Sequence, residues 1–246
     1  MIIDWEDAVA DEQKEFARSA TAEWLSRASL AEVSLAIRVN GAGTAAHNLD
    51  RKMITRMGTE YGGSITIVQA KAESADDVEW VSDLPAPTVA VALIESAKGL
   101  ASIQEIATAD RVVRLAFGAI DFALDSGMES DSEVMAYARA CIAINSRAAE
   151  LPGPLDSPEV SFRDGAKVRV AAAEARRFGF TGKLCIHPSQ IPLVHEALRP
   201  TDDEVSWARS IVGPDKGAVQ IDGTMVDKPL YERARRILNE AAEESE

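Results

Sequence analysis

The sequence predicts an α/β fold built on a parallel sheet, of the (β/α)8-barrel type, and three observations support this. The runs PTVAVALIES and RVVRLAFGAIDF are apolar without in/out alternation, which is typical of parallel strands covered on both faces. Segments with helical periodicity separate such runs, as crossovers between parallel strands require. The length of 246 residues suits one α/β barrel or one large doubly wound domain.

Strand and helix alternate in the predicted order of elements. The first strand covers 1–4, and the helix after it has Phe16, Ala20 and Trp24 four residues apart, which predicts its buried face. The next predicted elements are a strand over 34–39, a helix through 53 and 57, a strand over 64–68, a short helix over 76–84, two strands that end at 94 and 118, helices over 96–107 and 131–149, a strand over 151–156, a helix over 163–178 and a strand over 183–186. A helix over 202–212, a strand-like run over 218–221 and a helix from about 229 follow them.

The pattern contains seven barrel strands, one fewer than the eight of a closed barrel. The segment Met1-Ile2-Ile3 lies directly inside a strand, so the apparently missing first strand would precede Met1. Two explanations stay open: the start codon lies further upstream, or the barrel is naturally open. In both cases residues 1–199 are expected to form the barrel and residues 200–246 a C-terminal helix and lid extension.

Two consecutive predicted strands each deliver a carboxylate just past the C-terminal end. Glu95 follows VALI and Asp121 follows LAFGAI, about one βα unit apart. Hard cations such as Mg²⁺ take one or two carboxylates and keep positions open for substrate oxygens. Taken singly, Glu95 could cap the next helix and Asp121 could start a turn. The occurrence of both carboxylates at equivalent positions on one rim favours a metal site.

Composition excludes some classes of function. A net charge of −14 and a pI near 4.7 argue against nucleic-acid backbone binding, which needs clustered Lys and Arg. Small anionic ligands held by a local basic patch remain compatible with this charge. Cys141 and Cys185 resemble small buried hydrophobes of a reducing compartment. Neither a run of membrane-spanning length nor a signal peptide is present, which predicts a cytoplasmic protein without membrane contact.

Six blocks, in this order and spacing, resemble the citrate lyase beta-subunit-like family, and the match spans essentially the whole chain. The blocks are IIDWEDAVADEQKEFAR, LAIRVNG, VALIESAKGL, LAFGAIDFALDSG, GFTGKLCIHPSQI and GTMVDKPLYERA. That family includes malyl-CoA and citramalyl-CoA lyases and belongs to a wider group of metal-dependent aldolases built on TIM barrels. The resemblance implies a Mg²⁺-dependent carbon-carbon lyase that converts a short β-hydroxyacyl-CoA to acetyl-CoA and a 2-oxo acid. It also implies a homo-oligomer, a trimer or a hexamer.

The resemblance assigns roles to single residues. Glu95 and Asp121 match the Mg²⁺ ligands, in agreement with the strand-end argument, and Arg38 matches an arginine that holds the keto-acid end of the substrate. Asp227 matches the catalytic acid or base, which in those enzymes reaches the active site of a neighbouring subunit. Two structural alternatives stay open. Arg38 could form a rim salt bridge with Asp7, and Asp227 could cap the helix that starts near residue 229.

The segment DWED matches an acidic cluster beside the metal, where Asp4, Glu6 and Asp7 are expected to hold water and to pair with Arg38. Three departures from the family pattern accompany the match. The family's first strand and the loop after it, which help hold the CoA thioester, are not represented. The other two are Ile120 before the metal aspartate, where the family often has Glu, and Ala70-Lys71 in place of a Pro-Lys pair, and these two affect only substrate detail.

Other polar residues are weaker candidates. His187 in IHPSQ could face the site, but a histidine before proline at a strand end is more often a hydrogen-bonding turn residue. His47 and His195 are predicted to be surface residues, and Lys71 a solvated lysine rather than a CoA phosphate ligand. Two rival functions remain: a 2-oxo-acid aldolase that does not use CoA, and a non-catalytic metal-binding barrel.

Overall fold

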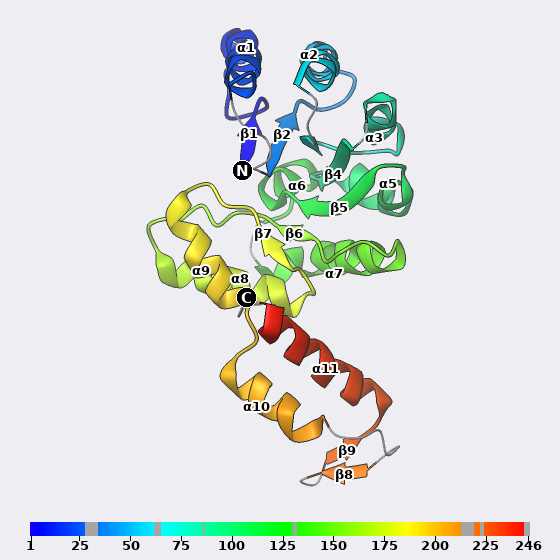
Figure 1. The fold of residues 1–246 in the computed structure, drawn as a ribbon, viewed down its shortest axis with the longest axis vertical. Coiled ribbons are helices and arrows are strands. Elements are labelled where there is room, and N and C mark those ends of the chain that lie inside the picture. Colours follow the sequence, from blue (N-terminus) through cyan, green and yellow to red (C-terminus); the bar gives the residue numbers. More distant parts are fainter. Residues whose placement is uncertain are drawn as a thin grey trace.

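The computed structural model describes residues 1–27, 34–61, 65–85, 87–129, 132–212, 219–221 and 224–243. Seven parallel strands form one sheet whose spatial order equals the chain order. They are β1 (Ile2–Asp4), β2 (Leu35–Val39), β3 (Ile65–Gln69), β4 (Val89–Ile94), β5 (Val112–Phe117), β6 (Leu155–Asp156) and β7 (Gly182–Lys183). The sheet curves as a partial barrel, and within the described residues it is open between β1 and β7 (Figure 1). The predicted barrel-type fold is confirmed.

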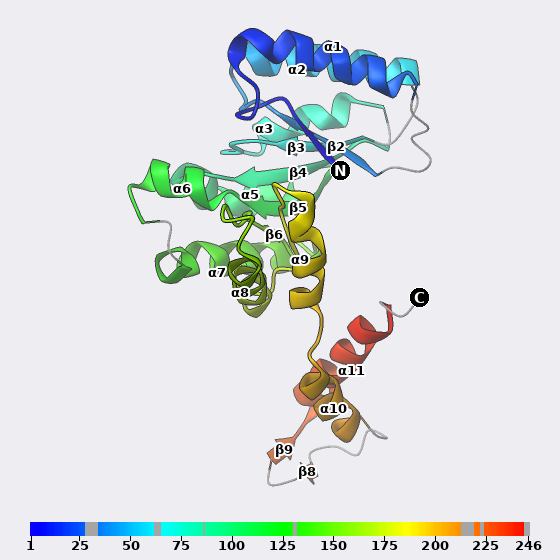
Figure 2. The same cartoon turned by 90° about the vertical axis from the view of Figure 1, so that its left-hand side faces the viewer.

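Most helices lie along the outer face of the sheet, and the short α6 lies beyond the carboxyl ends of the strands (Figures 1 and 2). They are α1 (Lys14–Leu25), α2 (Ala45–Tyr61), α3 (Asp76–Glu79), α4 (Ala97–Ala101), α5 (Ile103–Thr108), α6 (Ala119–Ser126), α7 (Ser132–Ala148), α8 (Gly165–Arg177) and α9 (Ile191–Leu198), with the 3-10 turns η1 (Asp11–Gln13), η2 (Trp80–Asp83) and η3 (Pro188–Gln190). The single helix predicted over 96–107 is two helices that meet at Ser102. None of the described helices has the length and apolar character needed to cross a membrane.

The core lies mainly between the sheet and these helices. Strand β4 is buried on both faces from Ala90 to Ile94, as its unbroken apolar run predicts. A smaller cluster of Val68, Val91, Leu93 and Ala116 fills the concave face of the sheet. Apolar packing on both faces fixes the register of β3, β4 and β5, and this register sets where their carboxyl ends lie.

The buried face of α1 differs from the predicted one. Phe16 is 74% exposed and Trp24 39% exposed. The buried residues of α1 are instead Lys14, Arg18, Thr21, Ala22 and Leu25. Polar partners decide this orientation, because Arg18 donates to the buried Asp50 carboxylate at 2.8 Å and Lys14 donates to the backbone oxygen of Trp5 at 3.1 Å. An apolar spacing alone could not reveal these partners, which lie elsewhere in the chain.

The two cysteines are less buried than predicted. Cys141 is half-buried on α7, and Cys185 is exposed. The reason for the second error is the length of β7, which ends at Lys183. Cys185 therefore lies in the loop after the strand, where its thiol contacts the Lys183 carbonyl at 3.6 Å.

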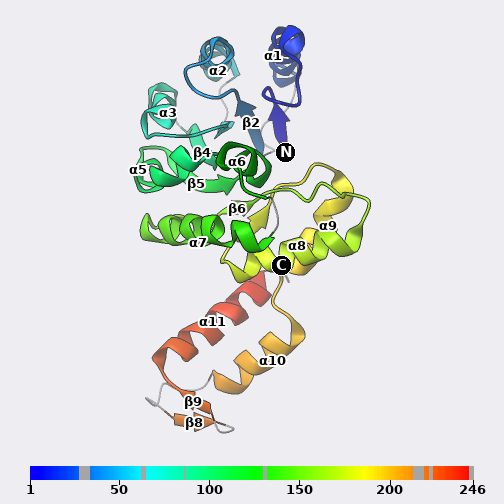
Figure 3. The ribbon, with the colours of Figure 1, turned by 180° about the vertical axis from the view of Figure 1, so that it is seen from behind.

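The last elements extend away from the sheet as an arm. They are α10 (Asp202–Ile211), β8 (Val219–Ile221), β9 (Thr224–Val226) and α11 (Lys228–Glu243). The strand-like run was predicted over 218–221, and residue 218 lies outside the described residues. The arm has its own apolar cluster, which includes Ala208, Ile211, Tyr231 and Ala234. Figures 1, 2 and 3 show it projecting beyond α9, with β8 and β9 at its outer end.

Candidate active site

The carboxyl ends of β1 and β2 place an arginine inside an acidic group. Asp4 and Arg38 are register partners at these ends. The Nε of Arg38 donates to Asp4 Oδ1 at 3.0 Å, and its Nη1 lies 3.1 Å from Oε2 of the buried Glu6. The rim salt bridge of Arg38 therefore forms with Asp4 and Glu6, whereas the predicted alternative named Asp7.

The acidic partners stabilise the charge on Arg38. Burial alone opposes that charge, but the hydrogen bond to Asp4 and the negative charges of Asp4, Glu6 and Glu95 outweigh it and raise the pKa of Arg38. A guanidinium has five N–H donors. In the described structure Nε, Nη1 and Nη2 each make one contact with Asp4 or Glu6, which leaves two donors for another acceptor.

Lys71 joins the acidic group to Glu95, a role that the sequence analysis missed. Its Nζ lies 2.6 Å from Glu6 Oε1 and 3.3 Å from Asp7 Oδ2. Its backbone N–H donates to Glu95 Oε2 at 2.9 Å, from a left-handed conformation with φ of 51°. The signal available in the sequence was its position, because Lys71 follows the end of β3, as Glu95 follows the end of β4.

Glu95 is a buried carboxylate directly after β4. Only 3% of the residue is exposed, and burial raises its pKa to about 8. The hydrogen bond from Lys71 opposes this rise, whereas the negative charges of Asp121 and Glu6 add to it. Glu95 does not cap the following helix, because the cap of α4 is Ser96, whose side chain accepts from the Gly99 N–H.

Asp121 lies beyond the end of β5, in the first turn of α6, and is half-buried. Its charge acts on Glu95, so the two strand ends do bring these carboxylates near each other. Gly118, between β5 and α6, makes this approach possible. A Cβ at position 118 would lie 2.5 Å from Glu95 Oε1, a distance that the packed side chain could not accept. Glycine therefore makes room for the Glu95 carboxylate.

The donor set fits a hard divalent cation. Glu95 and Asp121 offer carboxylate oxygens, and Mg²⁺ typically uses one or two such ligands together with water and substrate oxygens. Among the described residues there is no group of three or more His, Cys, Asp or Glu side chains that could enclose a metal by themselves. Burial, and to a smaller extent the negative charge of Asp121, raises the pKa of Glu95, so the ionised carboxylate favours a cation that offsets its charge.

Asp227 lies away from these strand ends within its own chain. It connects β9 to α11 at the outer end of the arm (Figure 1). Its backbone oxygen accepts from the Tyr231 N–H at 3.1 Å, but its side-chain Oδ1 is buried and has no hydrogen-bond partner among the described residues. Asp227 Oδ1 therefore does not make the hydrogen bond that would cap the start of α11, as the alternative interpretation predicted.

The three histidines have different environments. His187 caps η3, and its Nδ1 accepts from the Ser189 N–H at 3.1 Å, so the turn role is observed. His195 is exposed, as predicted. His47 is buried, so its predicted surface position is wrong. Its Nε2 lies 3.2 Å from Gln69 Oε1, and its ring packs edge-on against Trp80, a residue distant in sequence.

Two family models match the chain. The HpcH/HpaI aldolase/citrate lyase model matches residues 1–188, and a model described as a C-C bond lyase of the TIM-barrel fold matches residues 168–243. A citrate lyase subunit beta-like protein of Mycobacterium tuberculosis (strain ATCC 25618 / H37Rv) is 34% identical over 99% of this chain and 88% of its own length. The mitochondrial citramalyl-CoA lyase of Homo sapiens is 28% identical over 95% of this chain and 76% of its own length.

Solved structures are similar as well. The protein CitE from Mycobacterium tuberculosis in complex with magnesium, acetoacetate and coenzyme A has a TM-score of 0.84 and 32% identity, covering 98% of this chain and 89% of that chain. The same protein in complex with magnesium and pyruvate has a TM-score of 0.73 and 30% identity, over 96% and 87% of the two chains. Magnesium is thus bound in homologous structures. On the fold, the rim carboxylates and these matches, the chain belongs to the HpcH/HpaI aldolase/citrate lyase family and is a carbon-carbon bond lyase.

Proposed function

We propose that the protein is a Mg²⁺-dependent lyase that cleaves a short β-hydroxyacyl-CoA, such as citramalyl-CoA or malyl-CoA, to acetyl-CoA and a 2-oxo acid. The observation that supports this most is the buried Glu95 beside Asp121 and Arg38 at adjoining strand ends. Citramalyl-CoA lyase among the relatives, and magnesium and coenzyme A in the CitE complex, favour the same class of reaction.

Glu95 and Asp121 would hold the cation. When bound there, Mg²⁺ supplies Lewis acidity that lowers the pKa of the substrate hydroxyl and fixes its orientation. The protein contributes the arrangement of the ligands. The Lys71 N–H orients one oxygen of Glu95, and the glycine at position 118 leaves space for the other.

Arg38 would bind the carboxylate or the developing oxo group of the 2-oxo acid. Its planar, permanently charged fork suits two acceptor oxygens better than an ammonium group does. Asp4 and Glu6 hold the guanidinium in place, and two of its N–H donors are left for the substrate. Lys71 orients Glu6 from the other side, with its Nζ 2.6 Å from Glu6 Oε1.

Asp227 would complete the site from a neighbouring subunit. In cleavage, the substrate hydroxyl gives its proton to water and becomes the carbonyl of the 2-oxo acid, while the electron pair of the broken carbon-carbon bond passes to the α-carbon of the thioester, which becomes an enolate. Asp227 then donates a proton to that carbon, or removes one from the acetyl methyl group in the reverse direction. Residues 200–246 would act as a lid that excludes water from the enolate.

Two features support this arrangement in trans. The elements that flank Asp227 lie at the outer end of an arm that projects from its own barrel (Figure 3). Its Oδ1 is buried within that arm with no described hydrogen-bond partner. A homo-oligomer in which each arm covers the rim of the next chain would give this carboxylate a substrate to act on.

A turnover assay tests the proposal. The protein with Mg²⁺ should release acetyl-CoA and pyruvate from citramalyl-CoA, or acetyl-CoA and glyoxylate from malyl-CoA, and a chelator should stop the release. Glu95→Gln should remove the activity, whereas Glu105→Gln, an exposed control on α5, should retain it. Turnover of free 4-hydroxy-2-oxo acids instead of the CoA thioesters would identify an aldolase that does not use CoA. Bound Mg²⁺ without any turnover would identify a non-catalytic barrel.

A further inference from the structure

A fully buried glutamine lies at the end of β3, behind the rim. Gln69 is the last residue of this strand. Its Nε2 donates to the backbone oxygens of Asn40 at 3.1 Å and Ala70 at 2.9 Å. Its Oε1 lies 3.1 Å from Trp80 Nε1 and 3.2 Å from His47 Nε2. Every hydrogen-bonding position of the side-chain amide is thus occupied.

The partners of Gln69 fix the direction in which its amide faces. An indole N–H can only donate, so the amide oxygen must face Trp80. The NH2 group then faces the two backbone oxygens, and His47 Nε2 carries the ring proton. Gln69 is therefore an acceptor toward α2 and η2, and a donor toward the segments that follow β2 and β3.

One peptide group connects Gln69 to Glu95. The Ala70 carbonyl and the Lys71 N–H belong to the same planar unit. Its oxygen accepts from Gln69 Nε2 and its N–H donates to Glu95 Oε2, each at 2.9 Å. Because the C=O and N–H of a trans peptide point in opposite directions, a bond that holds the oxygen also sets the direction of the N–H.

The backbone at Lys71 needs such support. Its φ of 51° lies in the left-handed region, which a lysine side chain disfavours. Rotation of the peptide plane would return φ to negative values and turn the N–H away from Glu95. The position of the segment is held separately, since the Ala72 N–H donates to the Leu93 carbonyl at 3.2 Å. The bond from Gln69 to the peptide oxygen opposes the rotation itself.

We propose that Gln69 is a positioning residue for the Glu95 carboxylate, which it orients through the Ala70-Lys71 peptide. Because Glu95 is a ligand of the cation in the proposed function, this role rests on that function. Gln69 also binds the oxygen of Asn40, two residues after Arg38, and so holds a second part of the rim. Replacement of a residue that orients a metal ligand typically lowers metal affinity or activity roughly 10–100-fold.

Magnesium binding tests this role. Gln69→Glu keeps the size of the side chain and the oxygen that faces Trp80, but has an oxygen in place of the NH2 group. It should weaken the affinity for Mg²⁺, measured by calorimetry, roughly 10–100-fold. Gln69→Met removes the same donors without an added charge and should also weaken it. Thermal unfolding identifies the folded variants, and one of the two suffices for the measurement.

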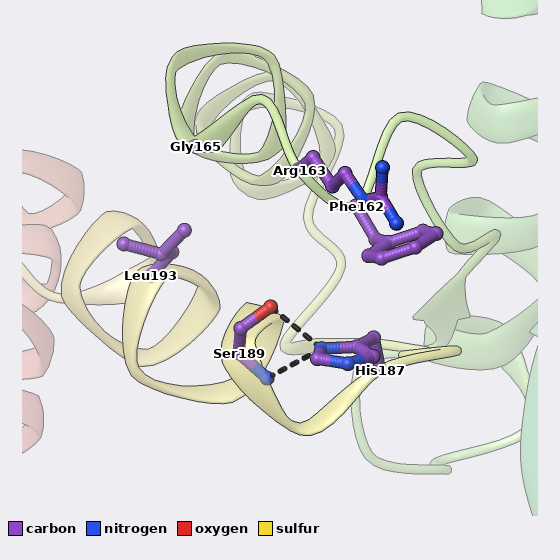
Figure 4. Close-up of a pocket in the computed structure, with 6 residues that line it drawn as sticks. All are labelled: Phe162, Arg163, Gly165, His187, Ser189 and Leu193. Carbon is purple, nitrogen blue, oxygen red and sulfur yellow. Dashed lines mark hydrogen bonds between the residues drawn. The ribbon is translucent and has the colours of Figure 1, made fainter.

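Gln190 provides the matched control, because it is also a buried glutamine, with 1% exposed. Its Oε1 accepts from the His187 N–H at 3.2 Å, and its Nε2 donates to the Glu159 carbonyl at 2.6 Å. Figure 4 shows His187 and Ser189 of this loop, which follows β7, a strand remote from β3 in the sheet. Gln190→Glu should therefore leave the Mg²⁺ affinity unchanged. An equal loss in the Gln69 and Gln190 variants would overturn the proposal.

A glycine at position 71 distinguishes positioning from packing. Glycine adopts a positive φ without strain, so the bond from Gln69 to the peptide oxygen matters less in a Lys71→Gly chain. The factor by which Gln69→Glu weakens Mg²⁺ affinity should be about fivefold smaller in that background. A role in packing alone would give the same factor in both backgrounds, and that result would contradict the proposal.

Hydrogen exchange reports on the peptide without metal or substrate. In protein treated with a chelator, the Lys71 amide should exchange faster in Gln69→Glu, while the amides of β4 stay protected. Unchanged exchange at Lys71 would refute the positioning role. Unchanged Mg²⁺ affinity in Glu95→Gln would instead refute the metal site of the proposed function, and faster Lys71 exchange would then still support the orientation of the peptide by Gln69. The two failures are therefore distinguishable.

Discussion

The rim of the barrel and the arm present functional carboxylates in opposite ways. At the rim, Glu95 accepts a hydrogen bond at 2.9 Å from the backbone N–H of Lys71, whose side chain belongs to a continuous set of ion pairs with Glu6 and Arg38. In the arm, Asp227 Oδ1 is buried beside a small separate apolar cluster and has no described partner. The rim is organised within one chain, whereas the arm carries a buried carboxylate oxygen that no described residue of that chain binds, which is compatible with the proposed role in a neighbouring subunit.

Removal of a rim carboxylate should have the largest effect. Glu95→Gln and Asp121→Asn should each abolish Mg²⁺-dependent turnover and weaken Mg²⁺ binding, because these two carboxylates are the proposed charged ligands of the cation. The fold should remain intact, since Gln replaces a buried group of equal size. Calorimetric titration with Mg²⁺ and thermal unfolding measure the two effects. Unchanged Mg²⁺ affinity in either variant would show that the cation is bound elsewhere.

Co-expression of two variant chains should distinguish the contribution of the arm from that of the rim. Asp227→Asn should lower the rate roughly 10²–10⁴-fold, as for loss of a general acid or base, but should bind Mg²⁺ normally. Co-expression with the Glu95→Gln chain should restore part of the activity, because mixed oligomers contain sites with an intact rim from one chain and an intact arm from another. Asp202→Asn, an exposed position on α10, should behave like the unmodified chain. Mixed oligomers as inactive as either parent would place Asp227 within its own site.

The pH dependence of Mg²⁺ binding should report on Glu95 alone. Since its pKa is raised from 4.5 to about 8, the cation must displace a proton below that pH. Mg²⁺ affinity should therefore rise about tenfold per pH unit up to about pH 8, and then level off. Calorimetry in buffers of different ionisation enthalpy would detect the released proton. An affinity that does not vary between pH 6 and 8 would contradict the buried environment.

In the metal-free protein, the raised pKa of Glu95 should make the free energy of unfolding depend on pH. The folded chain holds the Glu95 proton up to about pH 8 and the unfolded chain only to about 4.5. The folded state thus binds more protons between these values, so the free energy of unfolding should fall as pH rises through this window. Urea unfolding in the presence of a chelator measures this slope. Glu95→Gln should flatten it.

Loss of the Lys71 side chain, which joins the acidic group to Glu95, should have the smallest effect. Lys71→Met removes an ion pair with the buried Glu6 but keeps the backbone N–H that holds Glu95. The expected loss in kcat/KM is about tenfold, the value of one charged hydrogen bond. Lys98→Met is a suitable control, because Lys98 forms an exposed pair with Glu73. A loss as large as that of Glu95→Gln would mean that Lys71 contacts substrate directly.

The sequence predicted the parts of this molecule that depend on local pattern. Unbroken apolar runs located β2 to β5, and parallel register then placed Glu95 and Asp121 on one rim. Features that depend on distant partners were missed. The buried face of α1 follows from the pairing of Arg18 with Asp50, and β7 ends early because side-chain hydrogen bonds, not a strand, order the chain beyond it.

The Lys71 backbone shows why a site is harder to predict than a sheet. Its φ of 51° directs the N–H toward Glu95, and no residue type other than glycine or asparagine signals such a conformation in a sequence. His47 is a similar case, since its burial depends on contact with Gln69 and Trp80. Pairings of this kind are visible only when the strands are placed side by side.

The charges of the rim imply an order of events. Acidic side chains outnumber basic ones in the group formed by Asp4, Glu6, Asp7, Glu95, Asp121, Arg38 and Lys71. A β-hydroxyacyl-CoA brings further negative charge in its carboxylate and phosphates, so its approach to the bare rim is opposed. A divalent cation that arrives first offsets two units of this negative charge and gives the substrate oxygens a positive centre to bind. We therefore expect compulsory-order kinetics, in which Mg²⁺ binds before the thioester. Protein freed of metal by a chelator should bind the thioester weakly.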